Sequence, residues 1–379
     1  MARPTRKALG PDAKERAIAQ AIGVTRLGRI TGLDRAGVEV ACAVRPRGHV
    51  LQVSNGKGAD FASARRGALM EAAELAFAEQ VPLPEVVFGT ARELRARLGR
   101  DAVWTPDAVG SAGALLAPEL WSEDVVLGWR WGARLGGGDR VLVPACAVHC
   151  PPAGGPLLGP LVVRWSSNGS AAHLTAEAAQ RHALLEAVER DQLARILPDG
   201  WTEAATRARM LTRDGFPPSL ARSLERIERQ GFRAFVFDLT PTRGLGVPVA
   251  GALLLDEEQG PIPLTAGYAA AADPKSALEG ALLEAAQSRL TEIHGAREDV
   301  DVGARDEARV LGDALRKFKP RRTLRAMPSL SPAARTLGGL SRLLARHGHE
   351  ACAVRLAGAN VPVEAWKVVV RGFWVTELL

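Results

Sequence analysis

Three stretches of the chain carry two polar, mostly acidic side chains three positions apart, in segments rich in alanine and leucine. Residues at this spacing share one face of a helix. If the three faces converged, their carboxylates would repel one another unless a cation neutralised them. Oxygen ligands in this number favour Mg²⁺, which usually brings phosphate groups with it. The pairs are Glu71 and Glu74, Glu186 and Glu189, and Glu284 and Gln287.

Basic side chains beside these pairs are candidates for phosphate contacts. Arg190 directly follows the second pair, and Arg289 closely follows the third. A guanidinium can meet two phosphate oxygens at once, whereas Lys57, in a glycine-rich segment, would act as a point charge. A single acidic pair is more often part of a solvated helix face. The recurrence of the pair is what favours a binding site.

The pairs lie in segments that repeat one another, over residues 60–78, 175–194 and 273–290. The shared pattern is Ala-x-x-x-Ala-Leu-(Leu/Met)-Glu-Ala. Each segment begins with a residue that can cap a helix N-terminus, namely Asp60, Thr175 or Asp273. The first glutamate of the pair follows its cap by the same offset in all copies. We therefore predict three equivalent helices.

A strand is expected before each helix. Residues 50–53 and 161–165 are apolar and run into the same Ser-Asn-Gly sequence, and residues 264–267 take its place in the third copy. The copies are roughly 100 residues apart, which is too far for a solenoid. The sequence thus predicts an α+β domain in which strand–turn–helix units surround a shared centre.

Composition narrows the possible classes. The chain has 379 residues, 47% hydrophobic and 24% charged, as in ordinary globular proteins. Its net charge of +7 comes from residues 1–100, and a second basic run lies within residues 316–325. Without a nucleic-acid-binding motif, we interpret this charge as solvated surface and expect no nucleic-acid partner. P-loop, dinucleotide, nucleophile-elbow and kinase motifs are missing.

Metal binding by cysteine and membrane insertion are both disfavoured. Cys146, His149 and Cys150 are close in sequence, but a structural zinc site needs four ligands and a fourth is not evident. The long uncharged stretch 141–163 contains five prolines, which a membrane-spanning helix does not tolerate. The charged N-terminus does not match a signal peptide. We expect a cytoplasmic protein.

Taken together and in order, these segments resemble the YcaO family. The likeness runs from about residue 23 to the C-terminus, so residues 1–22 are expected to be a basic extension and residues 23–379 a single domain. The segments that carry the resemblance are 30–34 (ITGLD), 54–58 (SNGKG), 68–72 (ALMEA), 167–169 (SNG), 185–191 (LEAVERD), 238–240 (DLT), 247–249 (VPV), 284–289 (EAAQSR) and 295–297 (GAR).

The resemblance implies a YcaO-like fold with mixed sheets around a central ATP site, and ATP and Mg²⁺ as cofactors. It implies metal binding by Glu71, Glu74, Glu186, Glu189 and Glu284. It implies nucleotide contacts from these residues and from Lys57, Asn168, Arg190, Gln287 and Arg289, with Glu186, Arg190 and Gln287 as the catalytic group. The chain departs from the family pattern at Gly67, Leu75, His173 and Arg243.

The family phosphorylates a backbone amide oxygen after a nucleophile adds to the amide carbon. Loss of phosphate gives an azoline ring or, with external sulfide, a thioamide. A proline-rich C-terminal tail and a fused leader-binding domain are not found in this sequence, which favours thioamide formation with a TfuA-like partner. The alternatives are an azoline-forming cyclodehydratase of a ribosomal peptide pathway and a non-catalytic ATP-binding accessory protein. The expected partners are a peptide or protein substrate, a TfuA-like or leader-binding protein, and a second copy in a homodimer.

Overall fold

The computed structural model describes residues 12–109, 118–200, 202–258, 260, 262–295, 304–357 and 360–374. Parts of three expected features lie outside these residues. They are positions 1–11 of the basic extension, positions 296–297 of the last motif, and positions 375–379 at the C-terminus.

Among the described residues the strands form three separate sheets, and every pairing between named strands is antiparallel. The expected α+β class is confirmed, but the sheets are antiparallel rather than mixed. The first sheet has the order β1 (Arg26–Arg29), β2 (Glu39–Val44), β3 (Val53–Gly58). The second has the order β10 (Leu264–Ala270), β9 (Val249–Asp256), β8 (Phe232–Asp238). The third has the order β4 (Val86–Thr90), β5 (Val126–Arg134), β11 (Ala351–Arg355), β12 (Glu364–Val370), β7 (Ser170–His173), with β6 (Arg140–Pro144) paired to β5.

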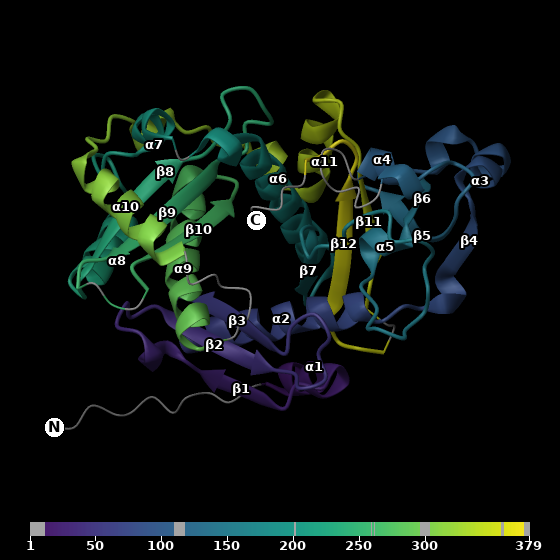
Figure 1. Ribbon diagram of the computed structural model, residues 1–379, viewed down its shortest axis with the longest axis horizontal. Coiled ribbons are helices and arrows are strands. Elements are labelled where there is room, and N and C mark those ends of the chain that lie inside the picture. Colours follow the sequence, from purple (N-terminus) through teal and green to yellow (C-terminus); the bar gives the residue numbers. More distant parts are fainter. Residues whose placement is uncertain are drawn as a thin grey trace.

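Each of the three repeated units occupies the edge of a different sheet. Strands β3, β7 and β10 are edge strands, and each leads into one of the predicted helices. These helices are α2 (Phe61–Glu79), α6 (Ala176–Gly200) and α9 (Pro274–Ile293). In Figure 1 the first sheet lies at the bottom, the second at the left and the third at the right, with α6 between the last two. The sequence repeat therefore corresponds to three strand–helix units, each at the edge of a different sheet of one fold.

The predicted caps are confirmed. The Asp60 and Asp273 carboxylates accept backbone hydrogen bonds from Ser63 at 2.8 Å and from Ser276 at 3.0 Å. The hydroxyl of Thr175 accepts one from Ala178 at 3.4 Å. Because an N-cap satisfies an otherwise free amide of the first turn, the three helices start at matching positions.

The Ser-Asn-Gly segments differ from the turns that we expected. In the first copy residues 54–56 lie inside β3, where Asn55 pairs with Cys42 of β2. In the second copy residues 167–169 form the turn, the preceding residues 161–165 form no extended strand, and β7 starts at Ser170. Within residues 161–165, Val163 alone forms a β-bridge, so no extended strand develops there. Apolar composition alone did not reveal this.

Glycine in two of these strands allows a helix to lie directly on the strand backbone. A Cβ atom at Gly56 would lie 2.0 Å from the Ala68 amide nitrogen, and one at Gly267 would lie 2.2 Å from that of Ala285. Both distances are far inside van der Waals contact. The equivalent glycines therefore set the close approach of α2 to β3 and of α9 to β10.

The N-terminal helix α1 (Ala13–Ile22) packs against α2. Ile18 is fully buried in the same apolar cluster as the alanines of α2. Glu15 of α1 is also buried, and its carboxylate lies 2.8 Å from the Arg65 guanidinium. The structure thus places residues 13–22 of the expected basic extension within the packed fold.

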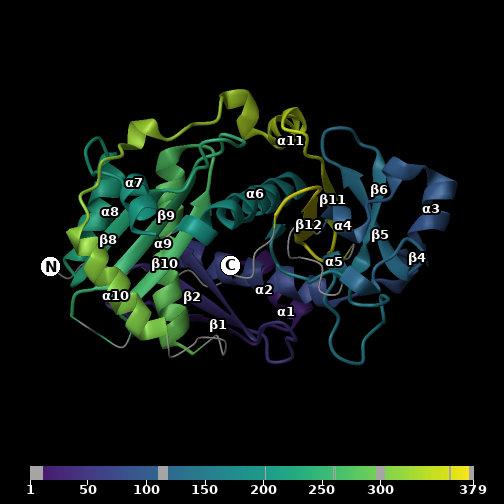
Figure 2. The ribbon, with the colours of Figure 1, turned by 45° about the horizontal axis from the view of Figure 1, so that its top comes forward.

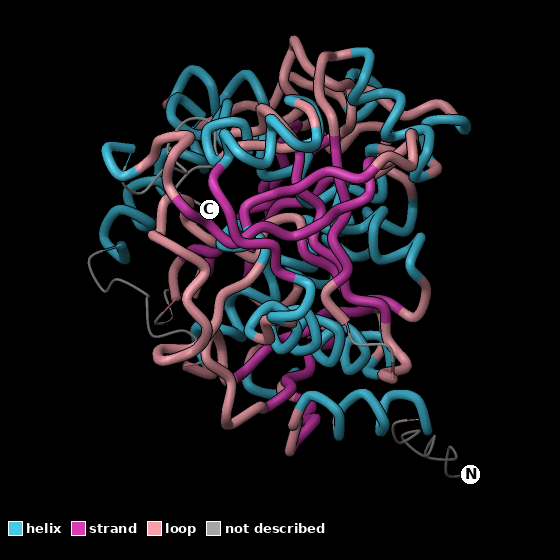
Figure 3. The backbone as a smooth tube through the Cα atoms, turned by 90° about the vertical axis from the view of Figure 1, so that its right-hand side faces the viewer, coloured by secondary structure: helices cyan, strands magenta, loops and turns pink. Residues whose placement is uncertain are grey.

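The remaining helices cover parts of the second and third sheets. Figure 2 shows α6 crossing the middle of the molecule between the second and third sheets. Figure 3 shows most strands in the middle, with helices and loops around them. Among the described residues, none of the helices combines the length and apolar character that crossing a membrane requires. The covering helices are α3 (Ala91–Leu98), α4 (Pro106–Val109), α5 (Ala145–Val148), α7 (Glu203–Arg209), α8 (Pro218–Glu228), α10 (Ala304–Lys317) and α11 (Leu337–Arg346).

Candidate active site

The acidic faces of the three repeated helices meet at the centre of the fold. The negative charges of Glu189 and Glu284 help to raise the pKa of Glu186. Those of Glu186 and Glu71 help to raise the pKa of Glu74. Lys57 of β3 connects the first unit to the third, because its Nζ lies 2.8 Å from a carboxylate oxygen of Glu284. The structure therefore brings together side chains that are more than 200 positions apart in the sequence.

The second member of each polar pair holds the edge strand of the next unit. Glu74 of α2 accepts a hydrogen bond from the Ala172 amide of β7 at 2.9 Å, and Glu189 of α6 accepts one from the Ala270 amide of β10 at 2.9 Å. Gln287 of α9 donates its side-chain amide to the carbonyl oxygen of Asn55 in β3 at 2.9 Å. The three contacts form a closed ring from the first unit to the second, the third and back.

This ring explains why the third pair ends in an amide. The partner of Gln287 is a carbonyl oxygen, which only a donor can satisfy, whereas the partners of Glu74 and Glu189 are N–H groups. A glutamate at position 287 would meet that oxygen with a second acceptor. Asn55 is also tied to α9 through its side chain, which donates to the hydroxyl of Thr291 at 2.9 Å.

The first member of the second pair, Glu186, has an environment that disfavours an isolated negative charge. Burial raises the pKa of Glu186 to about 7, and the charges of Glu189 and Glu284 act in the same direction. The guanidinium of Arg190 opposes this rise. Burial also raises the pKa of Glu74 well above its usual range, with the charge of Glu186 adding to the effect. A bound cation would relieve both carboxylates.

Arg190 is placed to receive an anion. Its Nε lies 3.5 Å from Glu189, too far for a good hydrogen bond, and this buried nitrogen finds no hydrogen-bond acceptor in the described structure. Burial alone would lower the pKa of Arg190, but the charges of Glu189 and Glu186 raise it, so the guanidinium stays charged. A buried cation with an unused donor fits a phosphate oxygen.

Within the described residues, the structure contains no group of three or more His, Cys, Asp or Glu side chains already arranged to hold a metal ion. The repulsion among the carboxylates and their contacts with Lys57, Arg190 and backbone amides account for this spread arrangement. The acidic oxygens and the unused Arg190 donor nevertheless match the ligand types that Mg²⁺ and a phosphate require.

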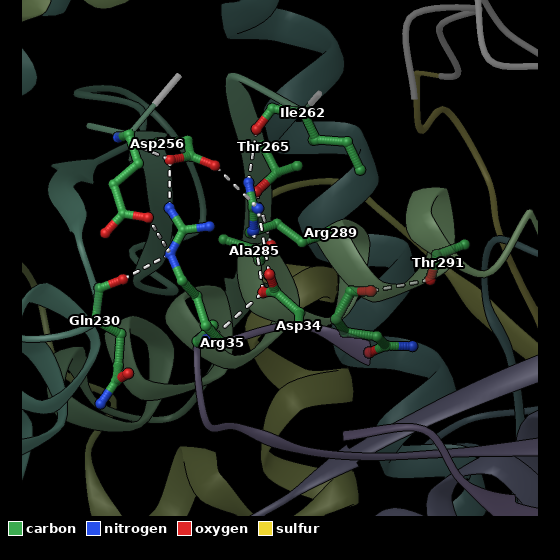
Figure 4. Close-up of polar contacts among 12 residues, drawn as sticks. Asp34, Arg35, Gln230, Asp256, Ile262, Thr265, Ala285, Arg289 and Thr291 are labelled. Carbon is green, nitrogen blue, oxygen red and sulfur yellow. Dashed lines mark hydrogen bonds and ion pairs between the residues drawn. The ribbon is translucent and has the colours of Figure 1, made fainter. Parts of the chain in front are cut away.

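Arg289 is placed elsewhere, contrary to the phosphate contact that we expected for it. Its side chain is 2% exposed and lies 3.1 Å from Asp34 and 3.4 Å from Asp256. It also donates to the carbonyl oxygen of Ile262 at 2.7 Å. Figure 4 shows Arg289 and Arg35 facing the two aspartates between them. The guanidinium that follows the third pair joins the segment between β1 and β2 to the second sheet, and these contacts take up its donors.

Two further side chains belong to the site but were missed in the sequence. Lys367 of β12 is 4% exposed and donates to the carbonyl oxygens of Ser166 and Asn168. Asn168 therefore has a defined contact through its main chain. His182 lies one turn before Glu186, and desolvation by the surrounding protein, followed by the charge of Lys57, lowers its pKa. A lone lysine in an apolar strand was a usable signal for Lys367. His182 gave no comparable signal.

The Cys146, His149 and Cys150 group has a structural explanation. His149 is buried, and its Nε2 lies 2.7 Å from the Arg130 guanidinium. Burial and the charge of Arg130 lower the pKa of His149 to about 3. Burial raises the pKa of the Cys146 thiol to about 11. These groups stay neutral and pack beneath the third sheet.

A centre built from three acidic helices and held by resident cations defines a class of metal–phosphate-binding α+β proteins. The family model described as YcaO cyclodehydratase, ATP- and Mg²⁺-binding, matches residues 55–373. The chain belongs to the YcaO family.

Curated relatives of this chain extend the likeness. An uncharacterised protein of Methanothermobacter thermautotrophicus is 34% identical over 286 residues, which cover 73% of this chain and 68% of the relative. A protein of Rhizobium leguminosarum bv. trifolii, described as uncharacterised and located in the tfuA 3′ region, is 32% identical over 292 residues, covering 73% of this chain and 64% of the relative. The chain thus spans about two thirds of the length of these relatives.

Solved structures share the fold. A heterocyclase in complex with substrate and cofactor superposes with a TM-score of 0.73 at 21% identity, covering 98% of this chain and 54% of that chain. The YcaO protein of Methanopyrus kandleri, bound with AMPPCP and Mg²⁺, superposes with a TM-score of 0.70 at 23% identity, covering 94% of this chain and 88% of that chain. The YcaO-like fold expected from the sequence is confirmed.

Proposed function

We propose that this chain binds ATP and Mg²⁺ at the acidic centre and uses ATP to phosphorylate a backbone amide oxygen of a peptide or protein. The observation that carries the proposal is the convergence of Glu74, Glu186 and Glu284, one from each repeated helix, beside the unused donor of Arg190. Membership in an ATP- and Mg²⁺-binding family supports the same reading.

Bound magnesium and ATP would supply a neutralised triphosphate and its transferable terminal phosphoryl group. The carboxylates of Glu71, Glu186 and Glu284 would hold the metal, and Glu74 and Glu189 would contribute the oxygen that their backbone contacts leave unused. Arg190 and Lys57 would contact phosphate oxygens and stabilise the charge that develops during transfer. Lys57 would exchange part of its contact with Glu284 for the phosphate.

Thioamide formation is the reaction that we favour. A sulfide adds to the amide carbon, the resulting oxyanion takes the terminal phosphoryl group of ATP, and phosphate then leaves with the former amide oxygen. The products are the thioamide, ADP and phosphate. The relative described as lying in the tfuA 3′ region supports a TfuA-like partner that brings the peptide or the sulfur. A second copy of the chain in a homodimer is part of the same proposal.

Cyclodehydration to an azoline is the second candidate. The family description names cyclodehydratases, and a heterocyclase shares the fold. In that reaction a Cys, Ser or Thr side chain of the peptide replaces sulfide as the nucleophile, and the amide oxygen leaves as phosphate in the same way.

Peptide mass separates the candidates. The chain would be incubated with ATP, Mg²⁺, sulfide, a TfuA-like partner and peptides encoded beside its gene. A gain of about 16 mass units indicates exchange of oxygen for sulfur at one amide, and a loss of about 18 indicates cyclodehydration, because the phosphorylated oxygen leaves in both cases. ATP that binds without being consumed, together with unchanged peptide mass, would support a non-catalytic accessory role.

Glu186→Gln provides the matched inactive variant, since it keeps the size of the side chain and removes its charge. We expect ATP turnover to fall by at least ~100-fold, as for loss of a group that stabilises the transferring phosphoryl. Glu177→Gln, at an exposed position on the same helix, should retain wild-type turnover. Equal turnover in the wild type and Glu186→Gln would remove this site assignment.

A further inference from the structure

Lys367 carries a buried positive charge in the middle of β12, whose other residues are apolar except for Glu364 at its start. It shares one face of β12 with Val363, Ala365 and Val369, which belong to the apolar cluster beneath α2. The lysine is 4% exposed. A charge in such a position is costly unless it is paired and hydrogen-bonded. The position is therefore held by interactions that offset this cost.

The hydrogen bonds of Lys367 all go to one turn. Its Nζ donates to the carbonyl oxygen of Ser166 at 2.6 Å and to that of Asn168 at 2.7 Å. The amide of the next residue, Val368, donates to the carbonyl oxygen of Gly169 at 2.7 Å. Gly169 has a φ of +76°, and a Cβ there would lie 2.5 Å from the Val368 carbonyl oxygen. The lysine and the strand after it thus fix the path of residues 166–169.

The same ammonium lies in the electric field of the acidic centre. The charges of Glu186 on α6 and Glu74 on α2 favour the charged form of Lys367, whereas burial disfavours it. Glu74 is meanwhile anchored to the amide of Ala172, four positions after Asn168, whose carbonyl oxygen Lys367 holds. His149, the other titratable group affected by this lysine, is neutral and carries no compensating negative charge. Lys57 pairs with Glu284, and Arg190 acts on Glu189 and Glu186, whereas Lys367 is the cation that acts on both Glu74 and Glu186.

We propose that Lys367 is a positioning residue that balances the charge of Glu74 and Glu186 and anchors the 166–169 turn beside them. It weakens the hold of these carboxylates on a divalent cation in the absence of nucleotide, and it keeps Asn168 in place for the nucleotide. The inference rests on the proposed function, because it assigns Lys367 to the same ATP and Mg²⁺ site.

The two effects of Lys367 predict opposite changes in affinity when its charge is removed. Lys367→Gln keeps a donor for one carbonyl oxygen but removes the charge, and Lys367→Met removes both. At pH 7 without nucleotide, where Lys367 is charged because its pKa is lowered only to about 8, Mn²⁺ binding measured by electron paramagnetic resonance should tighten about tenfold in both variants, since a nearby unit charge is lost. Binding of AMPPCP with Mg²⁺ should weaken, and more so in Lys367→Met.

Amide hydrogen exchange tests the anchoring directly in the unliganded protein. The Ser170 amide bonds to the Ser167 carbonyl oxygen at 2.8 Å within the anchored turn. Exchange at residues 166–170 should be faster in Lys367→Met than in the wild type. Lys367→Arg, which keeps the charge, should lie near the wild type in Mn²⁺ affinity, and Lys319→Met, at an exposed position, should match the wild type in every measurement.

The outcomes separate this inference from the function on which it rests. If the wild-type chain binds both Mn²⁺ and AMPPCP, while Lys367→Gln binds Mn²⁺ as the wild type does, Lys367 is not the counter-ion and the inference is wrong. A uniform loss of both affinities, in proportion to lost thermal stability, would show a structural lysine only and would also overturn it. A wild type that binds neither probe removes the proposed function and this inference together.

Discussion

Gln287 donates its side-chain amide to the carbonyl oxygen of Asn55 at 2.9 Å, across 232 positions of sequence. The contact joins the third repeated helix to the strand of the first unit. It completes the ring that Glu74 and Glu189 begin through their contacts with β7 and β10. Three contacts at matching positions therefore enclose the site. In two of them a carboxylate accepts a hydrogen bond, and in the third the amide of Gln287 donates one.

Gln287→Glu should break this closure. The carboxylate cannot donate to the Asn55 carbonyl oxygen and adds a charge to an acidic centre, so we expect a loss of about 1–3 kcal/mol in the free energy of unfolding. Urea unfolding without Mg²⁺ measures this loss. The control is Gln180→Glu, which makes the same substitution near the start of α6. The stability of this variant should stay near that of the wild type. Equal stability of Gln287→Glu and wild type would show that the contact does not close the site.

Lys57→Met should weaken nucleotide binding. Its ammonium lies 2.8 Å from Glu284 and is 29% exposed, so it is available to a phosphate oxygen. We expect the KM for ATP to rise about tenfold, as for loss of one charge-assisted contact. Lys275→Met removes a more exposed lysine that pairs with Glu279 on α9, and its KM should be unchanged. If both variants gave the same KM for ATP, Lys57 would not contact the nucleotide.

Arg289→Met should lower the free energy of unfolding. It leaves the buried carboxylates of Asp34 and Asp256 without this partner, and breaking a buried ion pair in this way costs about 3–5 kcal/mol. The milder Arg289→Lys keeps the charge and should lose less. Arg226→Met, at an exposed position on α8, should be neutral. A variant of Arg289 with wild-type stability and weakened AMPPCP binding would instead restore the phosphate contact expected from the sequence.

Gly56→Ala should disrupt the first unit. The added methyl group would lie 2.0 Å from the Ala68 amide nitrogen and 2.3 Å from the Ala64 carbonyl oxygen, and both atoms belong to the backbone of α2. Relief requires the helix to move away from its strand, so we expect a loss of several kcal/mol, on the scale of severe overpacking. Gly137→Ala, where nothing lies within 4 Å, should change the melting temperature little. A Gly56→Ala protein as stable as the wild type would contradict the close packing.

His149 should make stability fall in mild acid. Its pKa is lowered to about 3 in the folded chain by burial and by Arg130, whereas an unfolded histidine has its usual pKa of 6.5. The stabilising effect of a neutral His149 is therefore present above pH 6.5 and is lost as the pH falls towards 3. For one such group the loss between pH 7 and pH 5 is about 2 kcal/mol.

The slope of unfolding free energy against pH checks this assignment. In His149→Gln the slope between pH 7 and pH 5 should be shallower than in the wild type, even if the variant is less stable at every pH. His347→Gln, at an exposed position, should keep the wild-type slope. An unchanged slope in His149→Gln would mean that another group controls the acid transition.

The sequence by itself determined the repeated helices and their caps, because these features depend on local spacing. An aspartate or threonine before an alanine-rich segment satisfies the first-turn amides wherever that segment lies in the fold. The same spacing places each polar pair on one helix face, so the acidic composition of the centre was predictable. The family resemblance added its fold and the expected ATP and Mg²⁺, which the family model supports.

Only the tertiary structure decided what each polar side chain faces. Arg289 and Arg190 both follow a polar pair on a repeated helix, yet Arg289 meets two aspartates, one between β1 and β2 and one in β9, while Arg190 keeps an unused donor at the centre. Lys367 joins the site because β12 lies next to β7, a pairing between distant segments. Such contacts depend on how the three sheets are placed around α6, and local spacing does not encode that placement.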